Sequence, residues 1–264
     1  MMEPKPSNHF LVQKMAVIFT KKNNRIKEFM ERSKLCLLLF GILSFAINLS
    51  QAQTIEKKFH PDSLSHNSFS DLEKNCGKNK ILPATFEKQT LIALSYYPEL
   101  KDVKIKFRIK HKTTPLATRP SYGGMLRSAK KRTYIITISN KSRAFLDTIL
   151  LKNLNYNAQI GVLGHELSHV SDFAKKGFGG MCKVVFGHLS KNYVDHFEFN
   201  TDRRCIDHGL GYQLLAWSIN VRENLKSSSW KGAETLSLNT EDERYMNPGT
   251  IEKILANHPL YQKK

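Results

Sequence analysis

A histidine–glutamate–histidine motif lies in the second half of the chain, where residues 165–169 read His-Glu-Leu-Ser-His. Side chains four positions apart lie on one face of a helix, so the imidazoles of His165 and His169 can reach one metal ion. Glu166 then lies beside that ion, where its carboxylate can hold and deprotonate a water molecule. The alternative is an ordinary helix with a surface pair of histidines, but a chain of this composition contains the motif by chance only about 0.02 times.

A catalytic zinc site needs a third protein ligand and an open position for water. The pattern E-x-x-x-D over residues 198–202 supplies a candidate, because Glu198 and Asp202 share one face of the helix that we expect there. Glu198 can ligate the ion, and Asp202 can accept a hydrogen bond from the outer N–H of a ligating histidine. The competing third ligands are His188, Asp195, His196 and His208.

The two motifs resemble those of the gluzincin metallopeptidases over about residues 156–210. The E-x-x-x-D form is similar to that of the thermolysin-like and the HtpX/CAAX-prenyl-protease-like families. The chain departs from the integral-membrane prenyl-protein proteases, because it lacks their multiple apolar spans. The resemblance implies a zincin-like fold with the following roles: Zn²⁺ ligands His165, His169 and Glu198, general base Glu166, and orienting residue Asp202.

The resulting interpretation is an exported zinc metallopeptidase that hydrolyses peptide bonds in a peptide or protein substrate. Two alternatives stay open: a non-catalytic envelope protein with a structural or vestigial zinc site, and a zinc hydrolase of another amide, such as a cell-wall peptide. Amide hydrolysis also needs a donor that stabilises the oxyanion. The candidates are Tyr193 and His208, with His196 and Arg204 as further ones.

The periodicity of the chain predicts the elements that position these residues. Strict alternation over residues 103–111 and a β-branched run over 132–139 indicate two strands. The strands are joined by a long hairpin or by a loop with another short strand. We expect six helices: one that begins near Thr85, one from Asn155 or Asn157 to Lys176, three over 181–190, 193–208 and 212–225, and a short one that begins near Pro248. This order predicts an α+β domain with a small, mostly antiparallel sheet packed on the active-site helix and a helical C-terminal half.

Three further expectations concern the surroundings of the site. We expect the strand at 132–139 to bind the substrate backbone by strand addition, with a structural core strand as the alternative. The Pro- and Gly-containing loop at 117–124 is a plain turn or borders the cleft. Cys182 and Cys205 flank Glu198 in sequence and can form a disulfide in an exported protein, whereas Cys76 has no evident partner.

The N-terminal region has the layout of a secretory signal peptide. Leu35–Leu49 is continuously apolar but shorter than the roughly 20 residues of a membrane span. Basic residues precede this run, and Ser50-Gln51-Ala52 provides small residues for cleavage. We therefore expect a secreted or periplasmic protein with a start at Met30, the alternative being an anchor over residues 35–50. The domains are then 1–52 (extension and signal peptide), 53–80 (polar arm) and 81–264 (catalytic domain).

The charge of the chain is strongly positive, with 41 Lys and Arg against 23 Asp and Glu and a formal net charge of +18. Removal of residues 1–52 takes away 8 basic and 3 acidic residues, so the remainder keeps a net charge of +13. No motif that reads nucleic acid is present, and we expect no nucleic-acid partner. The basic surface favours association with an anionic envelope surface. Nothing in the sequence indicates an oligomeric state.

Overall fold

The computed structural model describes residues 55–62, 65–227 and 243–262. The chain divides into two units, Met1–Gln53 and Thr54–Lys264, and the description that follows concerns the second. The expected signal peptide, with Leu35–Leu49 and the start at Met30, lies outside the described residues. Within the described ranges, none of the helices combines the length and the apolar character that crossing a membrane requires.

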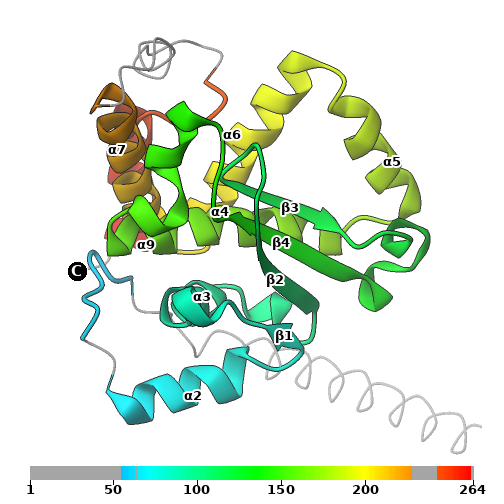
Figure 1. Cartoon of the computed structure of the whole chain (residues 1–264), viewed down its shortest axis with the longest axis horizontal. Coiled ribbons are helices and arrows are strands. Elements are labelled where there is room, and N and C mark those ends of the chain that lie inside the picture. Colours follow the sequence, from blue (N-terminus) through cyan, green and yellow to red (C-terminus); the bar gives the residue numbers. More distant parts are fainter. Residues whose placement is uncertain (1–54, 63–64, 228–242, 263–264) are drawn as a thin grey trace, which may run out of the picture. The chain divides into compact units, whose positions relative to one another are not determined.

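Four strands form one small mixed sheet in the order β1-β2-β4-β3 (Figure 1). They are β1 (Lys80–Ile81), β2 (Lys104–Lys110), β3 (Leu116–Pro120) and β4 (Thr133–Ser139). The β1–β2 and β2–β4 pairs are parallel and only the β3–β4 pair is antiparallel, so the expectation of a mostly antiparallel sheet is wrong. The chain runs back along β3 before it enters β4. The short strand therefore exists, and β2 and β4 do not form a hairpin.

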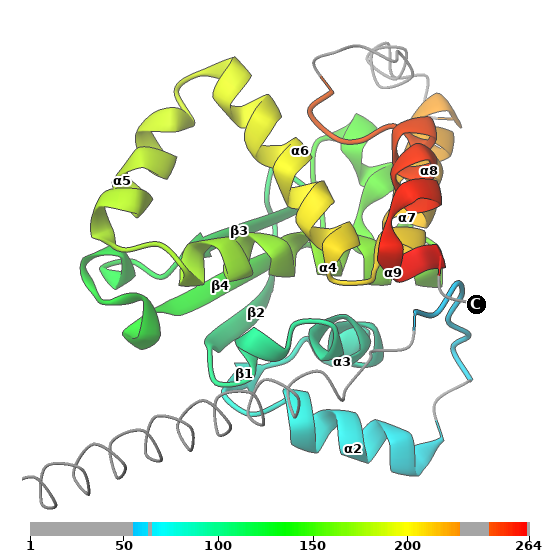
Figure 2. The same ribbon diagram turned by 180° about the vertical axis from the view of Figure 1, so that it is seen from behind.

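Helix α4 (Tyr156–Ala174) carries the His-Glu-x-x-His motif through the centre of the domain (Figure 2). Asn155 caps the helix by accepting a hydrogen bond from the Ala158 N–H at 2.9 Å, as its residue type predicts. The side chains of this helix are buried from Ala158 to Phe173. Its apolar residues join those of β2 and β4 in one core, and the helix is buried almost all round.

Five more helices follow the pattern that the sequence predicts. They are α3 (Glu87–Ser95), α5 (Phe178–Gly187), α6 (Lys191–Asp207), α7 (Gly211–Ser227) and α8 (Pro248–Asn257). The helical C-terminal half is thus confirmed, and α9 (Pro259–Gln262) extends it. The segment expected as a polar arm holds α2 (His66–Cys76), and the Phe59 N–H donates to the Asn157 side chain at 2.8 Å.

Hydrogen bonds from other segments hold α4 at its middle and at its C-terminal end. The Tyr97 hydroxyl donates to the Gly164 carbonyl at 2.7 Å. The buried guanidinium of Arg132 donates to the carbonyl of Phe173 in the last helical turn and to that of Lys176 just beyond it. The Arg132 guanidinium thus supplies donors at the C-terminal end of the helix, where carbonyls run short of backbone partners. Hydrogen bonds therefore tie α4 to the segments that precede β2 and β4.

The disulfide that the sequence permits between Cys182 and Cys205 is absent, since both thiols are free, as is that of Cys76. Cys205 is buried on α6 beneath α4, whereas Cys182 lies on α5. Burial raises the pKa of the Cys205 thiol, which makes it a poor nucleophile. Closeness in sequence therefore does not bring the two thiols together, because they lie on different helices.

Replacement of Gly161 by alanine is expected to destabilise the fold strongly. A Cβ at this position of α4 would lie 2.1 Å from the Gln213 carbonyl oxygen of α7, so the two helix backbones would have to separate. We expect a loss of about 1–3 kcal/mol or more in the free energy of unfolding, measured by urea denaturation. Gly179→Ala is the matched control, because a Cβ there meets no atom within 4 Å. Equal stability of the two variants would contradict this packing.

Candidate metal centre

Three side chains from two helices converge on one point. The Nε2 atoms of His165 and His169 lie 3.1 Å and 3.3 Å from the same carboxylate oxygen of Glu198. The ligand atoms of the three residues all lie within 4.8 Å of one another. This group of two imidazoles and a carboxylate could hold a metal ion. The structure thus brings together the ligand set that the sequence predicts, with α4 supplying both histidines and α6 supplying Glu198.

Two neighbouring residues of α6 orient the two imidazoles. The Nδ1 atom of His165 lies 2.7 Å from Asp202, the orienting residue that the sequence predicts. The Nδ1 atom of His169 lies 3.3 Å from the Thr201 hydroxyl, which itself donates to the Phe197 carbonyl at 2.8 Å. The hydroxyl can therefore accept the Nδ1 proton of His169. With the Nδ1 protons held in this way, both rings can give up the Nε2 proton and offer that nitrogen to a metal ion.

The electrostatics of the cluster favour a cation between the three side chains. Burial tends to lower the pKa of His165, but hydrogen bonds with Asp202 and Glu198 outweigh it and raise the pKa to about 10. Burial tends to raise the pKa of Glu198, but hydrogen bonds from the two imidazoles hold it far below its usual range. The Glu198 carboxylate thus faces this site and the buried Asp202 carboxylate lies behind His165, so positive charge at the centre is stabilised.

Glu166 lines the pocket beside the three converging side chains, and a side chain of the edge strand β3 holds its carboxylate. Its Oε2 accepts a hydrogen bond of 2.6 Å from the hydroxyl of Thr118 on β3. The carboxylate lines a pocket together with His165 and Asp202. The sequence offers the loop at 117–124 as a plain turn or as a border of the cleft. Its first residues belong to β3, and Thr118 of this strand contacts Glu166. Thr118 carries no local sequence signal of this role.

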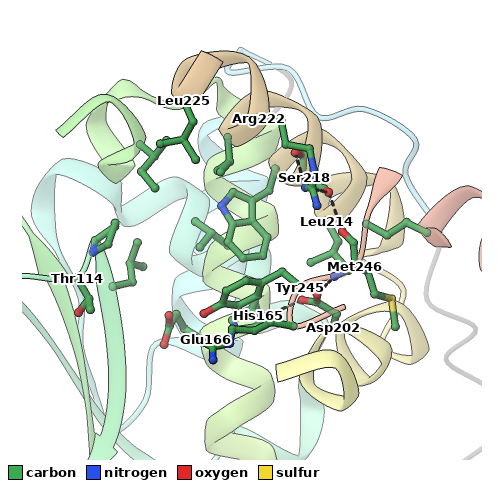
Figure 3. Close-up of a pocket in the computed structure, with 18 of the residues that line it drawn as sticks. Thr114, His165, Glu166, Asp202, Leu214, Ser218, Arg222, Leu225, Tyr245 and Met246 are labelled. Carbon is green, nitrogen blue, oxygen red and sulfur yellow. Dashed lines mark hydrogen bonds and ion pairs between the residues drawn. The ribbon is translucent and has the colours of Figure 1, made fainter. Parts of the chain in front are cut away.

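Tyr245 is a site residue that the sequence analysis did not single out. Its ring centroid lies 5.7 Å from that of His165, and it lines the same pocket as Glu166 (Figure 3). The next residue, Met246, donates its backbone N–H to Asp202 at 2.8 Å, which anchors the segment. Although part of Tyr245 reaches the surface, desolvation and the nearby carboxylates raise its pKa well above the usual value. Its hydroxyl therefore stays a proton donor.

The pocket beside Glu166 has a volume of about 390 Å³ and apolar walls (Figure 3). His165, Glu166 and Asp202 form a polar part of its lining, and Thr114, Ser218, Arg222 and Arg244 line it elsewhere. The apolar residues come from β3, α4, α7, α8 and the 3₁₀ segment Ala144–Ile149, and include Leu116, Leu146, Ile149, Val162, Leu214, Trp217, Val221, Leu225 and Ile251. The site thus opens into a cavity large enough for a bulky hydrophobic side chain.

Three of the competing third ligands, His188, Asp195 and His196, lie outside the cluster. His188 contacts the Val184 carbonyl through Nδ1 at 2.7 Å. Asp195 forms ion pairs with Lys191 and Arg244, which lower the pKa of its carboxyl. His196 is exposed on α6. None of the three belongs to the metal-ligating group found among the described residues.

The two expected oxyanion donors lie away from Glu166. His208 stacks on Tyr97, and its Nε2 lies 2.9 Å from Glu99, which also accepts a hydrogen bond from Ser171. Positions 164, 168 and 171 of α4 face this region, nearly opposite Glu166 on the helix. Tyr193 stacks on Phe197 and lines a separate cavity with Asp172 and His196, not the pocket that Glu166 lines. Closeness in sequence to Glu198 does not determine the side of α4 that a residue reaches.

The expected peptide-binding strand at 132–139 is also incorrect. This strand, β4, is paired with β2 on one side and with β3 on the other, so its backbone groups are occupied. In the sheet of the described residues, β3 is the edge strand next to the metal centre, and it pairs with β4 alone. An extended peptide can therefore be added only at β3 on this side of the sheet.

Searches of protein-family models, curated proteins and solved structures found no match to the chain. The functional interpretation therefore rests on the residues and the geometry described above.

Proposed function

We propose that the chain is a zinc-dependent metallopeptidase of gluzincin type with a zincin-like fold. The observation that carries the proposal is the convergence of His165, His169 and Glu198 on one point. Two imidazoles and a carboxylate with an open position are a donor set of catalytic zinc sites in hydrolases. The same set can bind iron(II), but a glutamate directly after the first histidine favours metal-assisted hydrolysis.

The residues of the chain divide the chemistry among them. Zinc, when bound, would act as a Lewis acid on the scissile carbonyl and activate a water molecule. Glu166 accepts the proton of the attacking water and later passes it to the leaving amine. The Thr118 hydroxyl, which donates to Glu166 at 2.6 Å, holds the carboxylate in place and leaves its other oxygen open to water. Tyr245 is the donor placed best to stabilise the developing oxyanion.

The edge strand and the pocket together suggest how a peptide binds. The peptide backbone pairs with the free edge of β3. This strand lies next to Glu166, because its Thr118 hydroxyl donates to the Glu166 carboxylate. One of its side chains then enters the apolar pocket that begins at His165 and Glu166. We therefore expect cleavage next to a large hydrophobic residue such as Phe, Leu or Met.

This preference can be measured with peptides that differ at one residue beside the scissile bond. We expect kcat/KM for Phe or Leu to exceed that for Ala by about 10- to 200-fold, the range for filling an apolar pocket. Val221→Trp, which fills the pocket from α7, should lower kcat/KM for the Phe peptide and change that for the Ala peptide little. Val185→Trp on the exposed side of α5 is the matched control. Equal rates for Phe and Asp peptides would contradict the assignment of the pocket.

The proposed activity itself is tested by incubating a mixed peptide library with the purified chain. Hydrolysis should stop when a chelator removes the metal and return when Zn²⁺ is added. Release of cell-wall peptides without cleavage of ordinary peptides would instead favour a zinc hydrolase of another amide. Zinc binding without any hydrolysis would favour a structural or vestigial site.

A further inference from the structure

Helix α5 exposes an apolar face. Positions 178, 182, 185 and 186 share one side of the helix, while Met181 and Val184 on another side are buried in the core. Phe186 is 70 % exposed, and Leu189, just beyond the helix, is 86 % exposed. Both views show α5 at the outer edge of the domain (Figures 1 and 2). Clustered apolar exposure of this kind is typical of an interaction surface rather than of ordinary solvent contact.

The neighbouring segment 121–131 extends this face. Its 3₁₀ turn Gly124–Leu126 contacts α5. Tyr122 and Leu126 in this segment are 90 % and 78 % exposed. We name the joint surface the basic apolar corner, because exposed lysines and arginines are interspersed with its exposed apolar residues along both segments. It comprises Tyr122, Leu126, Phe178, Val185, Phe186 and Leu189, with Arg127, Lys131, Lys175 and Lys183.

The charge of the corner is of one sign. Residues 173–191 contain four Lys and no Asp or Glu, and residues 103–146 contain twelve Lys or Arg and no Asp or Glu. The nearest acidic residues in sequence around α5 are buried and paired: Asp172 with Lys176 and Arg204, and Asp195 with Lys191 and Arg244. The exposed cations of the corner therefore attract an anionic surface without competition from carboxylates of their own segments.

We propose that the basic apolar corner docks on the surface of an anionic lipid bilayer. A bilayer offers both components that the corner matches, since lysines and arginines pair with acidic head groups while Phe and Leu enter the boundary of the acyl chains. A second copy of the chain fits less well, because two corners in contact would bring their cations together. Docking would place the metal centre close to proteins that are attached to the membrane. The proposal stands whether or not the site is a peptidase.

Sedimentation of the full chain with vesicles tests the proposal. We expect binding to phosphatidylcholine vesicles with about 30 % phosphatidylglycerol and weaker binding to phosphatidylcholine alone. Phe186→Asp/Leu189→Asp and Lys175→Glu/Lys183→Glu should each reduce the partition coefficient about tenfold or more. Ile81→Asp on β1 and Lys88→Glu on α3 are matched controls, because both residues are exposed and lie away from the corner. All variants share residues 35–49, so any contribution of that run cancels.

Hydrogen exchange of the unmodified chain provides a readout that does not depend on variants. Anionic vesicles should slow exchange of the α5 amides and leave that of the α3 amides unchanged. The proposal is overturned if the variants bind vesicles as the wild type does, or if α5 exchange does not respond. A change from dimer to monomer in Phe186→Asp/Leu189→Asp, seen by light scattering, would likewise overturn it in favour of a second copy as the occupant.

Discussion

Glu166→Gln should abolish peptide hydrolysis while the protein still binds zinc. The amide keeps the size of the carboxylate and can still accept from Thr118, so the fold and the three ligands stay in place. It cannot take a proton from water, and loss of a general base costs about 10²- to 10⁴-fold in rate. We expect kcat to fall by that factor with KM nearly unchanged. The rate is measured on the best peptide, and the zinc content is measured on the same sample.

Glu252→Gln on the exposed side of α8 is the matched control, and it should leave both quantities unchanged. If Glu166→Gln hydrolyses the peptide as fast as the wild type, Glu166 is not the base. If both proteins bind zinc and neither hydrolyses any peptide, a structural or vestigial site becomes the better interpretation. Loss of zinc in Glu166→Gln would mean that this carboxylate is itself a ligand.

Glu198→Gln is expected to weaken zinc binding by more than about 100-fold. Loss of an outer partner of a ligand already costs about 10- to 100-fold in affinity, and here a ligand itself is replaced. The amide also leaves Asp202 as the one carboxylate in direct contact with His165. The dissociation constant is measured by competition with a chelator of known affinity.

His196→Gln is the matched control on the same helix, since His196 is exposed and competes with Glu198 as a third ligand on sequence grounds. It should bind zinc with wild-type affinity. Unchanged zinc affinity in Glu198→Gln, or a larger loss in His196→Gln, would refute the ligand set. Circular dichroism of each variant checks that the comparison is made between folded proteins.

The parts of the site that follow helical spacing could be predicted from the sequence. His165 and His169 lie one turn apart on α4, and Glu198 and Asp202 lie one turn apart on α6. The local geometry of a helix therefore determines which pairs act together. The Asn155 cap likewise predicts where α4 begins. The role of Thr201 could not be predicted, because a threonine that hydrogen-bonds a ligating histidine has no characteristic spacing in the sequence.

The parts that depend on how elements pack could not be predicted in the same way. In the strand order, β3 rather than β4 lies at the edge of the sheet. The apolar 132–139 run is typical of a strand buried on both faces, but it does not show which strands pair with it. Tyr245 reaches the site because the Met246 N–H bonds to Asp202, a contact between segments far apart in the chain. His208 lies near Glu198 in sequence, but it faces the other side of α4.

The proposed zinc site can be tested by anomalous diffraction at the zinc absorption edge, from crystals of the protein grown with Zn²⁺. We expect one peak about 2.0–2.2 Å from the Nε2 atoms of His165 and His169 and from a carboxylate oxygen of Glu198. We also expect an open coordination position on the side of Glu166. A peak at other residues, or no peak between these three side chains, would refute the proposed zinc site.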